Sequence, residues 1–342
     1  MAHTPKKMLI VGPAWIGDMV MAQSLFKLIK QRNAGVDIDV LAPAWTVSLL
    51  NCMPEVHQAI NMSVEHGQLG LLARYHLAKQ LRAQQYDHAI VLPNSFKSAL
   101  IPWLAGIPKR TGWRGEFRYV LLNDMRALDK KKLPLMIEQY MALGLLADEA
   151  LPADYPYPEF HVSQDMQQHA LKDLQVELSG RPILAISPGA AYGPSKRWPE
   201  HYFAQVANHQ LSQGWDVWIF GAATDRPIID NIMSATDNRC VDFSGKTQLH
   251  QTLALLSLTS GVVTNDSGLM HMAAALNIPL IAIYGSTSPA FTPPLSKQAT
   301  ILKLDLACQP CFERVCPLQH FKCMLDLMPD KVIAAMQTWR SA

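Results

Sequence analysis

Short apolar segments alternate with longer stretches of helical periodicity along the chain, and this alternation constrains the fold more than any other feature. It is typical of β-α-β units, in which parallel strands are joined by crossing helices. We predict strands at residues 8–11, 38–42, 88–92, 183–187, 216–220, 261–264 and 280–284. We predict helices at residues 19–31, 69–84, 199–213, 249–258, 269–276 and 329–340. The sequence therefore predicts an α/β protein with parallel sheets.

The alternation occurs in two halves that a proline-rich segment separates. Residues 151–159, LPADYPYPE, cannot form a helix or an inner strand, because proline fixes φ and lacks a backbone donor. The length of 342 residues also favours two domains, at about 150 residues each. Residues 166–178 could form a helix on either side of a boundary between 150 and 180. We predict domains at 1–165 and 166–342.

The composition excludes several classes of protein. Apolar residues make up 49% and charged residues 17% of the chain, which excludes a disordered chain and a charge-rich coiled coil. Thirty Lys and Arg against 28 Asp and Glu give a net charge of +2, which argues against a nucleic-acid binder. We see no uninterrupted apolar run of transmembrane length and no signal peptide, and we expect a cytoplasmic protein.

The first candidate site is residues 12–18, GPAWIGD, between the first predicted strand and its helix. A carboxylate here, Asp18, lies where α/β proteins bind their ligands, at the carboxyl end of the strands. An aspartate at a helix start is also a common N-cap, so this interpretation stays open. The glycine spacing differs from G-x-G-x-x-G, which weakens a dinucleotide-binding interpretation.

Two further loops combine features that suit a diphosphate. Residues 187–199 form a glycine-bearing loop that ends in Lys196 and Arg197 before a predicted helix, and loop amides with two cations suit phosphate groups. Residues 264–271, TNDSGLMH, place Ser267 and Gly268 at a helix N-terminus, which favours an anion. The alternatives are solvated cations in the first loop, and a helix cap with a structural His271 in the second.

Basic residues interleaved with aromatic ones form a candidate surface for an anionic acceptor. Guanidinium groups pair well with phosphate and carboxylate, and a solvated basic loop is the alternative. The residues are Lys97, Arg110, Arg114 and Arg118.

Four of the six cysteines lie close together near the C-terminus, at Cys308, Cys311, Cys316 and Cys323. Four thiols can hold a structural zinc ion, although this spacing differs from the paired C-x2-C pattern. Disulfides and buried thiols are the alternatives, and a reducing cytosol disfavours the disulfides.

Several of these motifs, in order and over nearly the whole chain, resemble those of the glycosyltransferase family 9 heptosyltransferases. They are GPAWIGDMVMAQSL, LPNSFKSAL, GIPKRTGWRGEFRY, PGAAYGPSKRWP, TNDSGLMHMAAALNIPLIAIYG and SPAFTPP. The resemblance implies the GT-B architecture, with two Rossmann-like domains facing across a cleft. It implies an N-terminal acceptor-binding domain and a C-terminal ADP-heptose-binding domain, with a C-terminal helix that can pack back on the N-terminal domain.

The resemblance also implies a reaction. An L-glycero-D-manno-heptose is moved from ADP-heptose to the first heptose of the lipopolysaccharide inner core, with inversion and no required metal or cofactor. The implied acceptor is heptosyl-Kdo2-lipid A at the cytoplasmic face of the inner membrane, and nucleic acid is not a partner. A nicotinamide-dependent oxidoreductase, a nucleotide-sugar epimerase and a non-catalytic nucleotide-sugar binder are the alternatives.

Particular residues match the family's functional positions. Asp18 matches its general base, and Lys196 matches the lysine that neutralises the diphosphate. Asp225, displaced after Gly221-Ala222, corresponds to an acidic residue that contacts the ribose. The family also has a segment that contacts the sugar-phosphate of the donor. The residues of this chain that match it are Asp266, Ser267, Gly268, Leu269 and His271.

Overall fold

A computed structural model describes residues 5–62 and 70–340 of the chain. The chain divides into two compact units, Met1–Pro158 and Glu159–Ala342. The division falls inside the proline-rich segment, whereas the predicted boundary after residue 165 lies within helix α6 (Gln164–Asp173). Each unit is described by itself below.

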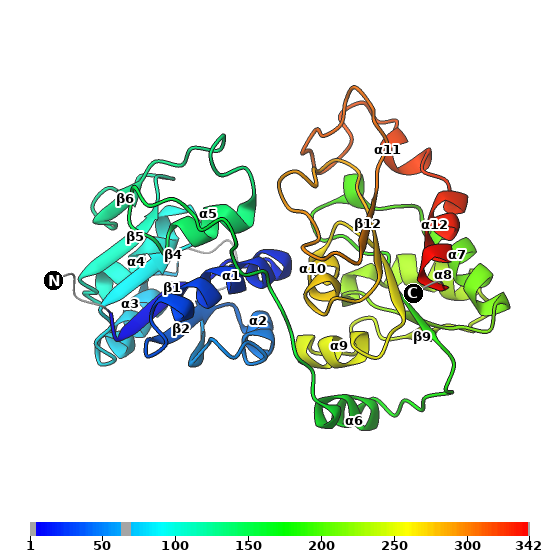
Figure 1. Cartoon of the computed structure of the whole chain (residues 1–342), viewed down its shortest axis with the longest axis horizontal. Helices are drawn as coiled ribbons and strands as arrows, with labels where there is room; N and C mark the ends of the chain where they lie inside the picture. The colour runs from blue at the N-terminus through cyan, green and yellow to red at the C-terminus, as the bar shows by residue number, and fades with distance from the viewer. Residues whose placement is uncertain (1–4, 63–69, 341–342) are drawn as a thin grey trace. The chain divides into compact units, whose positions relative to one another are not determined.

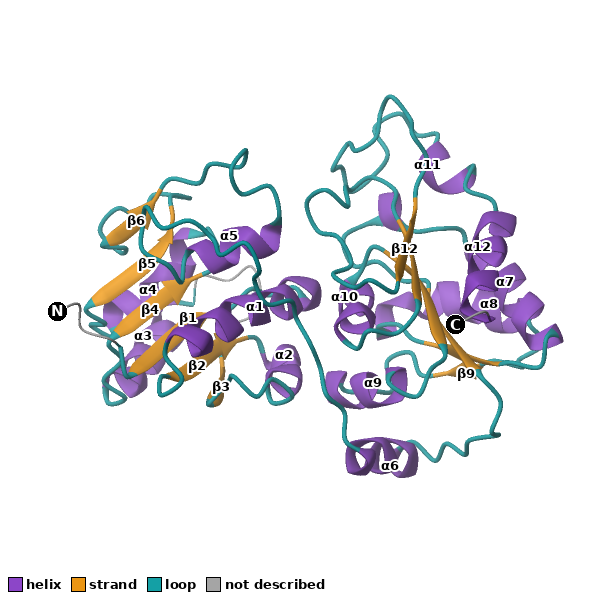
Figure 2. Cartoon of the chain, in the orientation of Figure 1, coloured by secondary structure: helices purple, strands orange, loops and turns teal. Residues whose placement is uncertain are grey.

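The N-terminal unit is a parallel six-stranded sheet with the order β3-β2-β1-β4-β5-β6 (Figures 1 and 2). The register is fixed at its centre, where Ile10 lies opposite Val40 on one side and Ile90 on the other. The strands are β1 (Lys7–Val11), β2 (Asp37–Ala42), β3 (Gln58–Asn61), β4 (His88–Val91), β5 (Lys109–Trp113) and β6 (Asp124–Arg126). The helices are α1 (Ile16–Arg32), α2 (Ala44–Leu50), α3 (Leu71–Arg82), α4 (Phe96–Leu104) and α5 (Met136–Ala142).

The C-terminal unit repeats this strand order in β12-β11-β10-β7-β8-β9, again with parallel neighbours. The strands are β7 (Ile183–Ser187), β8 (Asp216–Ile219), β9 (Val241–Asp242), β10 (Gly261–Asn265), β11 (Leu280–Ile283) and β12 (Ala299–Leu302). Its other helices are η1 (Pro194–Lys196), α7 (Glu200–Ser212), η2 (Ala223–Asp225), α8 (Arg226–Ala235), α9 (Leu249–Leu256), α10 (Gly268–Ala275), α11 (Lys322–Leu325), α12 (Pro329–Met336) and η3 (Gln337–Arg340). In both units the chain order reverses between the first and fourth strands, which is the Rossmann-like arrangement.

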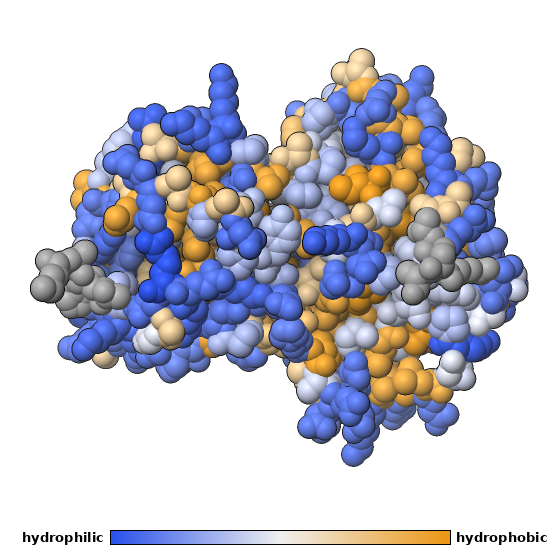
Figure 3. Space-filling view, viewed as in Figure 1, coloured by the Kyte–Doolittle hydropathy of each residue, from blue (hydrophilic) through white to orange (hydrophobic). Residues whose placement is uncertain are grey.

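The central strands form because their side chains are apolar on both faces. Every residue of β7 and β10 is buried, as expected where helices cover both faces of a parallel sheet. The fully buried Trp198 and Phe203 pack edge to face in the core of the C-terminal unit. Hydrophilic residues dominate the face shown in Figure 3, with apolar residues in patches between them. The predicted α/β fold class is confirmed.

The structure adds strands that the sequence analysis did not predict, and it corrects one expectation. Residues 109–113, expected within a basic loop, form β5. The predicted C-terminal helix is α12 followed by η3, and its buried Val332 and Met336 belong to the core of the C-terminal unit. Packing of this helix back on the N-terminal domain stays a prediction. The predicted helix at 69–84 is α3, and Leu69 lies outside the described residues.

No helix within residues 5–62 and 70–340 combines the length and apolar character needed to cross a bilayer.

Candidate functional site

The reversal of strand order in the C-terminal unit brings two of the predicted loops together. The loops follow β7 and β10, which are neighbours in the sheet, and ligands of open α/β sheets bind at this position. The side chain of Asn265, at the end of β10, forms hydrogen bonds with both ends of the loop that follows β7. Its Nδ2 donates to the Pro188 carbonyl at 2.7 Å, and its Oδ1 accepts from the Trp198 amide at 3.1 Å. The loop that carries Lys196 is therefore tied to the strand that carries Asp266.

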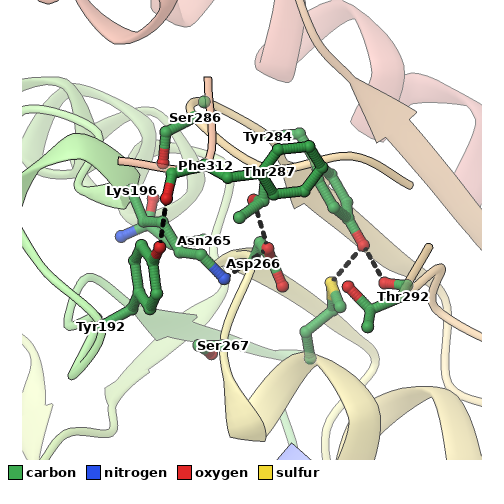
Figure 4. A network of polar contacts seen from close by, with 12 residues as sticks. Tyr192, Lys196, Asn265, Asp266, Ser267, Tyr284, Ser286, Thr287, Thr292 and Phe312 are labelled. Carbon is green, nitrogen blue, oxygen red and sulfur yellow. Dashed lines mark hydrogen bonds and ion pairs between the residues drawn. The ribbon is translucent and has the colours of Figure 1, made fainter. Parts of the chain in front are cut away.

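Lys196 and Asp266 form a largely buried ion pair. Lys196 Nζ lies 2.6 Å from Asp266 Oδ2, and the side chains are 13% and 4% exposed. Thr287 Oγ1 donates to the same carboxylate oxygen, and the ammonium lies 4.9 Å from the centre of the Tyr192 ring (Figure 4). An ammonium has three N–H donors, so its bond to Asp266 leaves capacity for a phosphate oxygen. The sequence analysis predicted Lys196 and Asp266, and the structure brings them into contact.

The N-terminus of α10 lies directly after Asp266. Ser267 is the N-cap residue in an extended conformation, its side chain makes no capping hydrogen bond, and Gly268 is the first helical residue. The first amides of a helix have no partner within the helix, and the helix dipole favours negative charge there. This terminus is therefore suited to an anion beside Lys196. Leu269, next in the helix, is partly exposed.

His271 is buried one turn into α10 and is neutral near pH 7. Burial lowers the pKa of the imidazole to about 4, although the charge of Asp266 acts in the opposite direction. Lys196 lowers the pKa further. The imidazole therefore adds no positive charge to the site at neutral pH.

Asp225 lies against the start of the Lys196 loop. Its side chain is buried, Oδ2 accepts from the Ala222 amide at 3.0 Å, and Oδ1 lies 3.9 Å from Arg197. A Cβ at Gly189 would lie 2.2 Å from Asp225 Oδ2, so the backbone approach requires glycine. The carboxylate of Asp225 thus lies beside the Lys196 loop. It also stabilises the turn at η2 by accepting from the Ala222 amide. Its contact with a ribose stays a prediction.

In the N-terminal unit, Asp18 occupies the equivalent edge of the sheet. It is the third residue of α1, directly after β1, and it is partly buried. The helix is capped by Trp15 without a side-chain bond, so the interpretation of Asp18 as an N-cap is wrong. Burial and then the charge of Asp18 raise the pKa of Tyr140, on α5, well above its usual value. Asp18 therefore lies close enough to Tyr140 to keep this phenol protonated at neutral pH.

The four residues predicted to bind the acceptor differ in how far their side chains are buried. Arg118 is fully buried and donates to the carbonyls of Pro93 and Trp113, each at 2.6 Å, so its assignment to a basic surface is wrong. Burial lowers the pKa of its guanidinium to about 10. Arg110 is partly buried and donates to the backbone carbonyls of Ile107 and Leu121, which also gives it a structural task.

Arg114 is exposed, and its side chain makes no ion pair or hydrogen bond with any residue in the described ranges. Lys97 is partly exposed at the start of α4, after β4. These two cations therefore fit the predicted surface, whereas Arg110 and Arg118 hold the fold together.

The four clustered cysteines are free thiols that line one pocket with Ser195 and Ser286. Within residues 5–62 and 70–340, no three Cys, His, Asp or Glu side chains are arranged as a metal site as they stand.

Sequence reasoning missed Asn265, Thr287 and Tyr192. Asn265 could have been noticed as a polar residue ending an apolar strand, where a buried amide needs hydrogen-bond partners. Thr287 follows β11, whose loop had not been considered, and the Tyr192 contact depends on the folding of the loop.

The chain matches the family model of glycosyltransferase family 9 (heptosyltransferase) over residues 74–322. It is 43% identical to lipopolysaccharide heptosyltransferase 2 of Escherichia coli (strain K12), over 96% of each chain. It is 47% identical to lipooligosaccharide heptosyltransferase 2 of Haemophilus influenzae, over 86% of this chain and 88% of that one. The structure of E. coli ADP-heptose lps heptosyltransferase II matches with a TM-score of 0.88 and 41% identity, over 97% of this chain and 98% of that chain.

Proposed function

The chain belongs to glycosyltransferase family 9, the heptosyltransferases, and we propose that it transfers L-glycero-D-manno-heptose from ADP-heptose to the first heptose of the lipopolysaccharide inner core. Support comes from the similarity to proteins named heptosyltransferase 2 or II. The loops after β7 and β10, whose features suit an anion, support it as well. The observation that carries the proposal is the Lys196–Asp266 pair at 2.6 Å, directly before the N-terminus of α10.

The C-terminal unit holds the ADP-heptose in this proposal. Lys196 and the first amides of α10 bind the diphosphate, which gains negative charge as the sugar departs. Their contacts therefore strengthen in the transition state, which is the condition for raising kcat. Asp266 keeps the ammonium in place, and Thr287 keeps Asp266 in place by donating to the same oxygen. Asp225 contacts the ribose.

The N-terminal unit supplies the base and the acceptor surface. Asp18 takes the proton from the acceptor hydroxyl as that oxygen attacks the anomeric carbon, while ADP leaves from the opposite face with inversion. Lys97 and Arg114 bind anionic groups of heptosyl-Kdo2-lipid A, whose Kdo sugars carry carboxylates. The reaction requires no metal or organic cofactor, since the residues named here provide the proton acceptor and the charge stabilisation.

We also propose that the protein acts at the cytoplasmic face of the inner membrane, where a lipid-anchored acceptor lies. Exposed side chains next to Arg114 support this, because Phe117, Tyr119 and Val120 are 85%, 60% and 74% exposed. Aromatic and apolar side chains beside cations suit an anionic lipid surface.

Ligand-induced stabilisation tests the donor class, since a ligand that binds only the folded protein raises Tm. ADP and ADP-heptose should raise Tm at concentrations where NAD has no effect. Equal stabilisation by NAD would favour the oxidoreductase alternative, and the absence of any shift with ADP would contradict the assignment of the donor site.

A further inference from the structure

The reaction leaves one feature of the C-terminal unit unused: the segment 308–323, called the cysteine loop below. Its four thiols, Cys308, Cys311, Cys316 and Cys323, line a single pocket. None of them is in a disulfide. Four thiols brought to one pocket by sixteen residues, most of them irregular chain, need an explanation, since only Cys323 among them also packs against the core of the C-terminal unit.

The cysteine loop is bound to the segments beside the proposed donor site. Gln309 Nε2 donates to the Gly285 carbonyl at 2.7 Å, and the Phe312 amide donates to the Ser286 carbonyl at 2.7 Å. The Ser195 amide, next to Lys196, donates to the Arg314 carbonyl at 3.2 Å. The conformation of the cysteine loop is thereby coupled to the position of Lys196.

The backbone on one side of the pocket is directed toward the sulfur of Cys316. Backbone groups of residues 318–321 form hydrogen bonds with this sulfur. Gln319 and Phe321 adopt positive φ values of 56° and 46°, which turns this stretch around the sulfur. Metal-bound thiolates and reactive thiolates are both stabilised in this way.

The four thiols lie on the walls of one pocket. A cation bound among them would hold them as thiolates, because a coordinating thiol is deprotonated outright. His320 lines the same pocket, but its Nδ1 accepts from the Lys322 amide at 3.0 Å, so the four thiols are the better ligands.

We propose that Cys308, Cys311, Cys316 and Cys323 together bind one thiophilic divalent cation, Zn²⁺ or Fe²⁺, in a structural site that braces the loop carrying Lys196. Four sulfur ligands in a tetrahedron are the typical environment of both ions. The thiols turn inward by rotation about their χ1 angles, four S–H bonds lose their protons to solvent, and four metal–sulfur bonds form. The oxidation state of the metal does not change.

Metal analysis of the full chain, purified without chelator, tests the site directly. We expect about one Zn or Fe per chain in the wild type and in Cys52→Ser, a control on the N-terminal unit. We expect at least a fivefold lower content in Cys316→Ser. Metal-free wild-type protein, or full metal content in Cys316→Ser, would overturn the proposal.

A second measurement does not depend on whether the variant folds. Titration of the wild-type protein with a mercurial should release the metal as four thiols react. Four thiols that react without metal release, or disulfides among them by mass spectrometry, would refute the site.

The bracing role has its own readout. Release of the metal should raise the Kd for ADP about tenfold, and adding back Zn²⁺ should restore it. An unchanged Kd would overturn the bracing role. The role rests on the proposed function, but metal content is measured without substrate, so either can fail alone.

Discussion

Lys196 is the residue on which the proposed donor site most depends, because its ammonium lies next to the buried carboxylate of Asp266. Removing one partner of a buried pair leaves the other charge uncompensated, which is more costly than losing a surface ion pair. Thr287 donates a hydrogen bond to the carboxylate of Asp266, and the ring of Tyr192 contacts the ammonium of Lys196. The same contacts that keep Lys196 ordered place it beside the N-terminus of α10, where an anion is favoured.

Lys196→Ala should weaken ADP-heptose binding and slow transfer at saturating donor. The diphosphate gains charge as it departs, so the lost contact affects the transition state more than the ground state. We expect kcat to fall about 100-fold, in the range found when one such donor is removed. Lys303→Ala, at an exposed pair with Asp305, is the control. Unchanged donor affinity and kcat would show that Lys196 has no part in the site.

Asp18→Asn should reduce kcat by about 10²–10⁴-fold, the range typical of general-base catalysis, while leaving the Kd for ADP within twofold. The substitution keeps the shape of the side chain but removes its ability to accept a proton at neutral pH. Asp37→Asn, exposed at the start of β2 in the same unit, serves as the control. Turnover near the wild-type level in Asp18→Asn would remove Asp18 from the mechanism.

At the scale of elements, the sequence could predict most inner strands, but it missed the inner strand β5 and the edge strands β3, β6, β9 and β12. β7 and β10 were found because residues 183–186 and 261–263 form short runs without a polar side chain, which is typical of strands covered on both faces. β5 (KRTGW) was read as a loop because its cations dominate the pattern, although the strand is paired on both sides. Edge strands bury less, so their hydrophobic signal is weak.

The candidate site was predicted unevenly for a related reason. Motifs after central strands identified Asp18, Lys196 and Asp266, because the carboxyl ends of parallel strands meet at one edge. A basic residue in sequence gives no information on its burial, so Arg118 was placed on the surface. Only the folded loop shows that its guanidinium satisfies backbone carbonyls.

The segment after β5 contains one exposed arginine, Arg114, and one buried arginine, Arg118. Arg114→Gln should raise the acceptor KM severalfold and reduce its salt dependence, with the donor Kd unchanged, because an exposed cation acts through local charge. Arg118→Gln should instead lower the free energy of unfolding, on the order of 3 kcal/mol, since buried carbonyls lose their donor. Acceptor kinetics and urea denaturation measure the two effects, and the opposite assignment of effects would contradict this division.

At the scale of the whole molecule, stability should depend on two buried histidines, one in each unit. Burial is the main cause that lowers the pKa of His88 and of His271 to about 4, below the ordinary value of 6.5. The unfolded chain binds these protons first, so the free energy of unfolding falls as the pH falls from 6.5 to 4. Asp124 and Asp242, with pKa values of about 2, contribute only at lower pH.

Urea denaturation at pH 7 and pH 5 should therefore show a loss of about 1–2 kcal/mol for each histidine. His88→Gln should be less stable at pH 7, because Thr111 loses a 2.7 Å contact, and it should lose less on acidification. Equal stability at the two pH values in the wild type would contradict the assignment of neutral buried imidazoles.

The most direct test of the whole account is transfer in vitro from ADP-L-glycero-D-manno-heptose, with mass spectrometry of the lipid product. Heptosyl-Kdo2-lipid A should gain one heptose as one ADP is released, and Kdo2-lipid A without the first heptose should stay unmodified. Omitting added metal should leave the rate unchanged in protein that retains its own. Release of ADP without a heptosylated product, or transfer to Kdo2-lipid A at an equal rate, would contradict the proposed reaction.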